Sequence, residues 1–211
     1  MQNNFFNKPL NPSLSEKNIN RKEPAFFLRP SSATDERWFV PGLVTWVNTT
    51  TLTGVLNNIV RLSPFVIETS TTIDKVSVNV TAVGSASSTM RVAIYNSKND
   101  LPNMLIWDSG AFNCASTGIK SVLFNSFILK PGLYWMAWNT NSTNNTLTLT
   151  ALAPGGVYPL LGLPNTIGSA LGINLTYSYS YANFEQYINN VSFTIGTTSN
   201  IMYGIRTPIN N

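Results

Sequence analysis

The chain has 211 residues, of which 43% are hydrophobic and only 10% are charged. Because Lys and Glu are scarce, Asn, Thr and Ser must cover the surface, a composition that suits β-strands and turns better than surface helices. The formal net charge of +4 does not indicate nucleic-acid binding, since the basic residues near the N-terminus are interspersed with acidic ones.

The first 35 residues are rich in proline and show neither a helical nor an alternating pattern. Proline removes a backbone donor and keeps the preceding residue extended, so this stretch cannot build a core alone. Its aromatic residues form two pairs, Phe5-Phe6 and Phe26-Phe27. Exposed Phe pairs are not needed for solubility. We therefore predict an extended N-terminal arm over 1–35 that docks these pairs on another surface. The alternative is a flexible terminus that does not dock.

The first residues also lack the charged start and long apolar core of a secretory signal, and no apolar run approaches membrane-spanning length. We therefore expect no membrane insertion.

From Trp38 onward the pattern is that of β-strands. Apolar and polar residues alternate with period two, which is typical of half-buried strands, over 76–81, 146–150 and 177–181. The runs 90–95 and 133–138 are apolar or aromatic on both sides, as in central strands covered on both faces by a second sheet or a neighbouring subunit.

Turn residues separate these segments, for example Asp108-Ser109-Gly110, Lys130-Pro131-Gly132, Pro154-Gly155-Gly156 and Asn189-Asn190. Since no long amphipathic helix interrupts them, we predict an all-β fold, an antiparallel β-sandwich of jelly-roll-like type over 36–211. The polar stretch 96–103 is explained by a hairpin connection. The apolar, Gly- and Pro-containing stretch 157–173 must be covered, either by the end of the sandwich or, as we favour, by a subunit interface.

The only cysteine is Cys114, and the chain has no histidine. These counts exclude an intramolecular disulfide, a cysteine-based zinc site, imidazole metal sites and His-dependent triads. We expect Cys114 to be a small core residue, since as a nucleophile it would lack its usual base. No metal or cofactor is expected.

Catalysis by paired carboxylates is not indicated either. The sandwich region offers only scattered acidic residues: Glu68, Asp74, Asp100, Asp108 and Glu185. Glycoside cleavage needs two carboxylates held opposite each other, and no pattern pairs these. We therefore predict no catalytic residues, with Asp74 and Asp108 acting at turns or strand ends.

Aromatic residues provide candidates for sugar stacking. A core position in a strand is the better explanation for each of them: Trp107, Trp135, Trp138, Tyr177, Tyr179 and Tyr181. Tyr177, Tyr179 and Tyr181 alternate with serines and would form an amphipathic strip able to contact a receptor or a sugar. This interpretation requires the strip to be open to water.

Five segments, in this order and spacing, resemble a β-sandwich domain that recurs in bacteriophage tail fibre, spike and head-fibre proteins. The segments are Arg37-Trp38-Phe39-Val40-Pro41, Asp74-Lys75-Val76-Ser77-Val78, Arg91-Val92-Ala93-Ile94-Tyr95, Asp108-Ser109-Gly110 and Pro131-Gly132-Leu133-Tyr134-Trp135-Met136-Ala137. The similarity covers roughly 36–155. Phe39 replaces a more common Tyr or aromatic pair, and the 96–103 loop is poorer in glycine than usual.

The resemblance implies a structural protein of the virion, assembled in the cytoplasm of the bacterial host and usually trimeric. Its arm would attach to capsid, collar or tail proteins through Phe5, Phe6, Phe26 and Phe27, while the sandwich faces outward for host attachment. A host-surface glycan is a further candidate partner. The alternative function is a carbohydrate-binding or capsid-decorating module without a fibre role.

Overall fold

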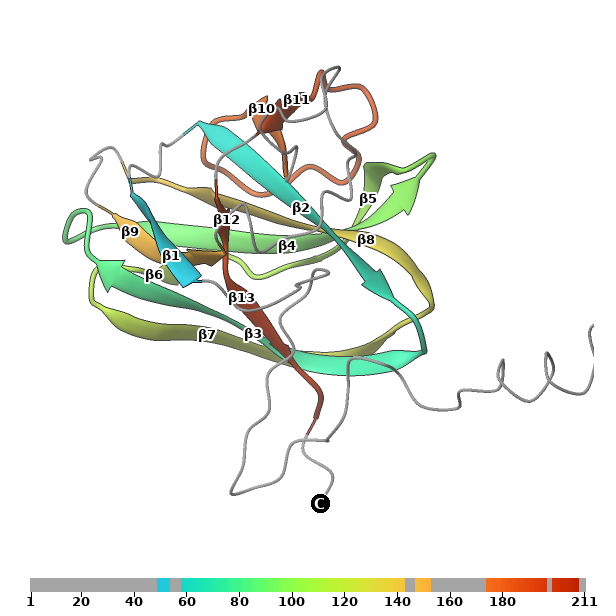
Figure 1. Ribbon diagram of the computed structural model, residues 1–211, viewed down its shortest axis with the longest axis horizontal. Coiled ribbons are helices and arrows are strands. Elements are labelled where there is room, and N and C mark those ends of the chain that lie inside the picture. The colour runs from blue at the N-terminus through green and yellow to red at the C-terminus, as the bar shows by residue number, and fades with distance from the viewer. Residues whose placement is uncertain (1–48, 54–57, 143–146, 153–173, 197–198, 209–211) are drawn as a thin grey trace, which may run out of the picture.

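The computed structural model describes residues 49–53, 58–142, 147–152, 174–196 and 199–208. The arm with its Phe pairs, the segment 37–41 and the apolar stretch 157–173 lie outside these residues, as do the Pro154 turn and part of the alternation over 146–150. Within the described part, the chain forms two antiparallel sheets and no helix (Figure 1). The predicted all-β sandwich is confirmed.

The first sheet has six strands. They are β1 (Thr49–Thr53), β3 (Thr71–Ala82), β7 (Gly118–Leu129), β9 (Thr148–Leu152), β12 (Asn200–Ile201) and β13 (Tyr203–Arg206). The order is β1-β9-β3-β13, with β12 beside β9. β9 and β13 pair with one edge of β3, and β7 pairs with the other edge. Among the described strands β7 pairs with no further strand, so it is an edge strand.

The second sheet has seven strands. They are β2 (Ile59–Ile67), β4 (Thr89–Lys98), β5 (Leu101–Asp108), β6 (Phe112–Asn113), β8 (Gly132–Thr140), β10 (Asn174–Ser178) and β11 (Thr194–Gly196). The order is β11-β10-β2-β8-β4-β5, with β6 also beside β4. β4 and β8 are the two runs that are apolar on both sides, and they lie in the middle of this sheet, as predicted.

The main core fills the space between the two sheets. Val92 and Ile94 of β4 and Met136 of β8 face the valines of β3, Val76 and Val78, in one buried cluster. The alternation predicted for β3 is therefore correct on its inner side. Its outer side is less exposed to solvent than expected, because Ser77 is also buried. The Ser77 hydroxyl lies 2.6 Å from that of Ser121 on β7.

A tight turn explains how β4 passes into β5. Asn99 and Asp100 have φ values of 53° and 60°. A two-residue hairpin loop of the type I′ class needs positive φ at both positions, and Asn and Asp tolerate that region better than most residues. The polar stretch 96–103 is thus a hairpin, as predicted, but both strands extend further into it than its polarity suggested.

Asp74 does not lie at a strand end, which corrects the sequence-based expectation. It lies inside β3, at the irregularity in pairing with β7 between Ile73 and Lys75. Arg206 of β13 binds it with two hydrogen bonds, Nε to Oδ1 at 3.0 Å and Nη2 to Oδ2 at 2.7 Å. The carboxylate therefore ties the last described strand to β3 at the point opposite the extra residues of β7.

Cys114 is fully buried, in agreement with its predicted core role. Burial raises the pKa of its thiol to about 11, because a thiolate is poorly solvated in the interior. At neutral pH the side chain is therefore a neutral, unreactive thiol.

Substitution of Ile94 by alanine tests the core between the sheets. Ile94→Ala removes a fully buried side chain, so the free energy of unfolding should fall by about 2–5 kcal/mol. Denaturant unfolding followed by tryptophan fluorescence measures this. Ile195→Ala is the matched control, since that side chain is half exposed; its effect should be under about 1 kcal/mol. Equal losses for both variants would contradict the assigned core.

Candidate functional site

Residues 179–193, here called the covering segment, connect β10 to β11 and lie on the outer face of the seven-stranded sheet. They give the molecule a third layer, which is visible in orange above β4 and β8 (Figure 1). Phe184 and Ile188 of this segment are buried in a second apolar cluster with Tyr95 of β4 and Trp135 of β8. The outer faces of β4 and β8 are thus covered by the chain itself.

Backbone hydrogen bonds hold the covering segment along β5. The amide of Leu105 donates to the carbonyl of Gln186 at 2.9 Å, and the amide of Ile188 donates to that of Asn103 at 3.0 Å. An isolated antiparallel bridge joins Met104 and Tyr187 between them. The segment therefore pairs with the outer edge of β5.

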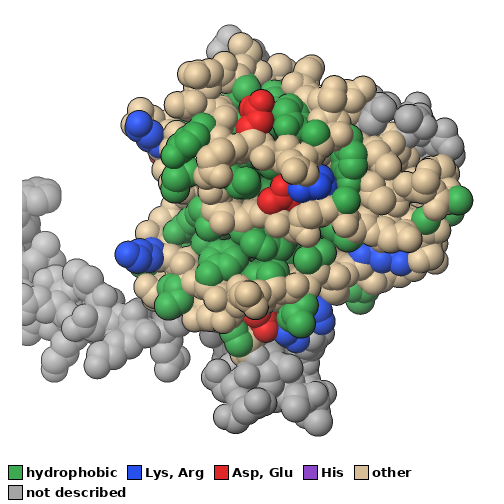
Figure 2. Space-filling model, turned by 180° about the vertical axis from the view of Figure 1, so that it is seen from behind, with side chains coloured by type: hydrophobic (Ala, Val, Ile, Leu, Met, Phe, Trp, Pro, Cys, Tyr) green, Lys and Arg blue, Asp and Glu red, His purple; other side chains and the backbone are tan. Residues whose placement is uncertain are grey.

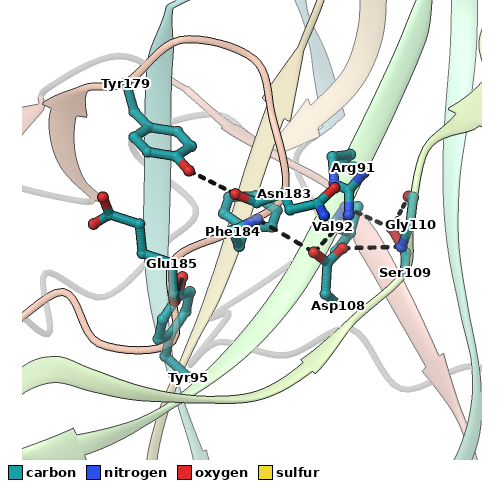
Figure 3. Close-up of polar contacts among 10 residues, drawn as sticks. All are labelled: Arg91, Val92, Tyr95, Asp108, Ser109, Gly110, Tyr179, Asn183, Phe184 and Glu185. Carbon is teal, nitrogen blue, oxygen red and sulfur yellow. Dashed lines mark hydrogen bonds and ion pairs between the residues drawn. The ribbon is translucent and has the colours of Figure 1, made fainter.

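Asp108 is the polar centre of this region (Figure 3). Its Oδ2 accepts hydrogen bonds from Nη2 of Arg91 at 2.7 Å and from the amide of Phe184 at 3.3 Å. Its Oδ1 accepts from the amide of Gly110 at 2.9 Å, which closes the turn after β5. One carboxylate thus joins β4, β5, the turn and the covering segment.

Two further contacts fix the same corner. The amide of Val92 donates to the Ser109 hydroxyl at 2.9 Å, and the amide of Ser109 donates to the Val92 carbonyl at 2.8 Å. Gly110 has a φ of 68°, in the left-handed region that favours glycine. The segment Asp108-Ser109-Gly110 is therefore a turn, as predicted, and Asp108 is the last residue of β5.

The Arg91–Asp108 pair is mostly withdrawn from water, with 12% and 16% of the two side chains exposed. Desolvation offsets much of the attraction in such a pair, so it adds little net stability. Loss of one partner, however, leaves a largely buried charge uncompensated. The pair therefore favours the one position of the covering segment in which Asp108 binds both Arg91 and the amide of Phe184.

The predicted tyrosine strip is not an open surface. β10 ends at Ser178, and the chain then folds back over the sheet. Tyr177 is only 5% exposed and lies against the rings of Tyr179 and Phe193, with centroids 5.9 and 5.8 Å away. Burial raises the pKa of its hydroxyl.

Tyr179 and Tyr181 are partly buried as well. The Tyr179 hydroxyl donates to the carbonyl of Asn183, within the covering segment. Burial raises the pKa of both hydroxyls. Tyr177 and Tyr179 thus contact residues of the covering segment. The exposure that a sugar-binding strip requires is not met by Tyr177 and is met only in part by Tyr179 and Tyr181.

The exposed aromatic residue of this region is Tyr187, at 57% exposure. Its neighbours Glu185 and Gln186 are also exposed, while Phe184 and Ile188 are buried. Tyr187 could not be identified from the sequence, because its segment shows no regular alternation of apolar and polar residues. The one available signal was its position between two large apolar residues that both needed burial.

The tryptophans are core residues or lie beside the core. Trp135 and Trp138 are fully buried, and the guanidinium of Arg61 lies 5.1 Å from the ring centroid of Trp138. Trp107 of β5 is partly buried and contacts Phe124 of β7, with ring centroids 4.4 Å apart. This contact brings the edge of one sheet against the edge of the other.

The acidic side chains of the sandwich are dispersed. Asp74 and Asp108 are paired with arginines, and Glu68, Asp100 and Glu185 are exposed. Among the described residues, no group of three or more Cys, Asp or Glu side chains could hold a metal ion. Likewise, none of the described elements is a helix with the length and hydropathy needed to span a membrane.

A shallow hollow of about 180 Å³ lies on the outer face of the six-stranded sheet, beside Ile119. Its lining is largely apolar, and its polar groups are engaged with neighbours: Ser77 with Ser121, and Asn79 through Nδ2 with the Thr150 hydroxyl at 2.9 Å. It offers no charged group to a substrate.

Comparison with known proteins gives no relative: no family model matches the chain, and no curated protein matches it.

Replacement of Asp108 tests the polar corner. Asp108→Asn keeps the shape but leaves Arg91 without its counter-charge, so the free energy of unfolding should fall by about 2–4 kcal/mol. Hydrogen exchange at the amide of Phe184 should accelerate at the same time, because that amide loses a charged acceptor. Glu185→Gln is the control, as its side chain is exposed. Unchanged exchange at Phe184 in Asp108→Asn would rule out the anchoring role.

Proposed function

We propose that this chain is a non-enzymatic structural protein of a bacteriophage particle, a component of a tail or head fibre or spike. The arm over 1–35 attaches it to capsid, collar or tail proteins, and the sandwich is displayed outward. The observation that supports this most directly is that segments carrying the resemblance meet in space. Arg91 and Asp108, which begin two of them, form the ion pair at the polar corner.

A second contact within the resemblance supports the same proposal. The hydroxyl of Tyr134 donates to the carbonyl of Lys130 at 2.8 Å, across the turn that contains Pro131 and Gly132. The spacing of the Pro-Gly-Leu-Tyr segment is thus needed to close the turn from β7 to β8. The Tyr and the Pro-Gly turn of this segment therefore depend on one another in the fold. A segment constrained in this way is less easily matched by chance, which supports the resemblance.

The construction of the sandwich suits display on a particle. Its central strands are buried on both faces, the hairpin turn between β4 and β5 is short, and Asp74 and Asp108 serve to join strands. Such a domain is rigid and presents edges and loops to partners. The resemblance also implies attachment to the host surface and a trimer.

Substitution of the Phe pairs tests the attachment role. In the full chain, Phe5, Phe6, Phe26 and Phe27 changed together to Ser should abolish incorporation into particles, because the arm would lose its apolar anchors. Mass spectrometry of purified particles, scaled to the major capsid protein, measures the copy number. Changing nearby polar residues, Asn3, Asn4, Asn18 and Asn20, to Ser is the matched control. Unchanged incorporation of the Phe variant would refute the anchoring role.

A carbohydrate-binding module is the second candidate function, and one observation favours it. Tyr187 presents an exposed ring beside the exposed polar side chains of Glu185 and Gln186, on a segment fixed by backbone hydrogen bonds. Sugars are bound in this manner, with the ring against the apolar sugar face and polar groups at its rim.

Two substitutions of Tyr187 test this candidate. Tyr187→Ala should weaken glycan binding about tenfold or more, a loss of roughly 1.4 kcal/mol, whereas Tyr187→Phe should retain it since stacking needs only the ring. Binding is measured first on a glycan array with the wild-type chain and then by calorimetry with the best ligand. No binding by the wild-type chain, or equal binding by Tyr187→Ala, would remove this candidate.

A further inference from the structure

We propose that the outer edge of β7 is a contact between two copies of this chain, in which each copy adds its β7 antiparallel to that of the other. The pairing makes one continuous sheet across the two copies. It does not depend on the virion assignment, and it predicts a two-fold dimer in place of the trimer that the resemblance implies. Four observations on β7 lead to it.

The first observation is exposure. The three most exposed large hydrophobic side chains among the described residues all lie on β7: Ile119 at 70%, Leu123 at 68% and Ile128 at 62%. Scattered exposed apolar residues need no explanation, but three on one strand do. Burial of such aliphatic side chains favours association, because it removes apolar surface from water.

The second observation is that these side chains share a face. Ile119 is opposite Asn79 of β3, and Leu123 is opposite Lys75, while the intervening Val122 is opposite the inward-facing Val76. Ile119 and Leu123 therefore project from the outer side of the six-stranded sheet. The hollow beside Ile119 lies between this side chain and the β3 residues Ser77 and Asn79.

The third observation concerns the backbone edge. Native proteins protect free edge strands with charges, proline, short length or a covering element. β7 has twelve residues, no proline and one charged residue, Lys120, whose ammonium group is held by the Ser116 hydroxyl at 2.6 Å. β5, the neighbouring edge of the other sheet, carries Pro102 and is paired with the covering segment. Among the described residues, the covering segment thus pairs with the edge of β5, whereas no strand pairs with the outer edge of β7.

The fourth observation is self-complementarity, which identifies the occupant as a second copy. With the two-fold axis at Ser121, Ile119 of each copy is opposite Leu123 of the other, on the same face. The small Ser121 meets its own counterpart at the axis, and Lys120 is opposite Val122, so no like charges are opposed. The regular part of β7, Gly118 to Leu123, is long enough for this register, and the irregularity after Leu123 ends it.

Light scattering and sedimentation of the full chain test the contact. The wild-type protein should have twice the 23.2-kDa mass of one chain. Leu123→Lys should shift it to monomer, with at least a tenfold higher dissociation constant, because the two-fold axis places the charge in the contact twice. Ile195→Lys is the matched control on another exposed strand and should remain dimeric. Circular dichroism establishes that both variants are folded.

A disulfide tests the register independently. In a Cys114→Ser background, Ser121→Cys should cross-link the two copies on mild oxidation, since directly opposed residues of antiparallel strands have Cα atoms about 4.5–5.5 Å apart. Asn125→Cys lies on the same strand away from the axis and should not cross-link. A wild-type monomer or trimer, or a dimer that survives Leu123→Lys and forms no Ser121→Cys cross-link, would overturn the proposal. The attachment role is decided separately by the Phe variants.

Discussion

The fold depends on one constraint: β4 and β8 are apolar on both faces, so both faces of the sheet they centre must be covered. The six-stranded sheet covers the inner face, where Ile94 and Met136 are buried. The outer face, with Tyr95 and Trp135, is covered by the segment after β10. A two-layer sandwich would have left those aromatic side chains in water, at a cost of about 1.5–3 kcal/mol for each large side chain.

This constraint also explains where the polar contacts are concentrated. A covering segment without regular structure has few backbone partners of its own, so it must find them on the sheet. It does so through the edge of β5, through Asp108 and through the Tyr95 hydroxyl, which donates to the carbonyl of Glu185 at 2.8 Å. The Arg91–Asp108 pair is largely buried for the same reason, because the segment closes over it. Figure 2, seen from the opposite side to Figure 1, shows an acidic and a basic side chain lying together near the centre of a largely hydrophobic and neutral face, with further charged side chains around it.

Sequence alone predicted the fold class and the two central strands, because strand alternation and two-sided apolar runs depend on local residue order. It favoured a core position for Tyr177, which is buried, but it could not say which chain segment buries it, because alternation says only that one face of a strand is buried. Tyr187 was missed because an irregular segment has no period. The roles of Asp74 and Asp108 depend on Arg206 and Arg91, and the partner of Asp74 is distant in the chain. The docking of Phe5, Phe6, Phe26 and Phe27 stays a prediction, as those residues lie outside the described ranges.

The late position of the covering segment in the chain has a consequence for biosynthesis. β4 and β8 leave the ribosome well before residues 179–193, since synthesis proceeds from the N-terminus. During that interval the outer face, with Tyr95 and Trp135, has no covering layer of its own. A nascent chain in this state exposes a flat aromatic sheet surface, the kind of surface that chaperones bind and that aggregates when translation stalls. Synthesis of the C-terminal quarter of the chain is therefore also the step that covers this aromatic surface and protects the new domain from aggregation.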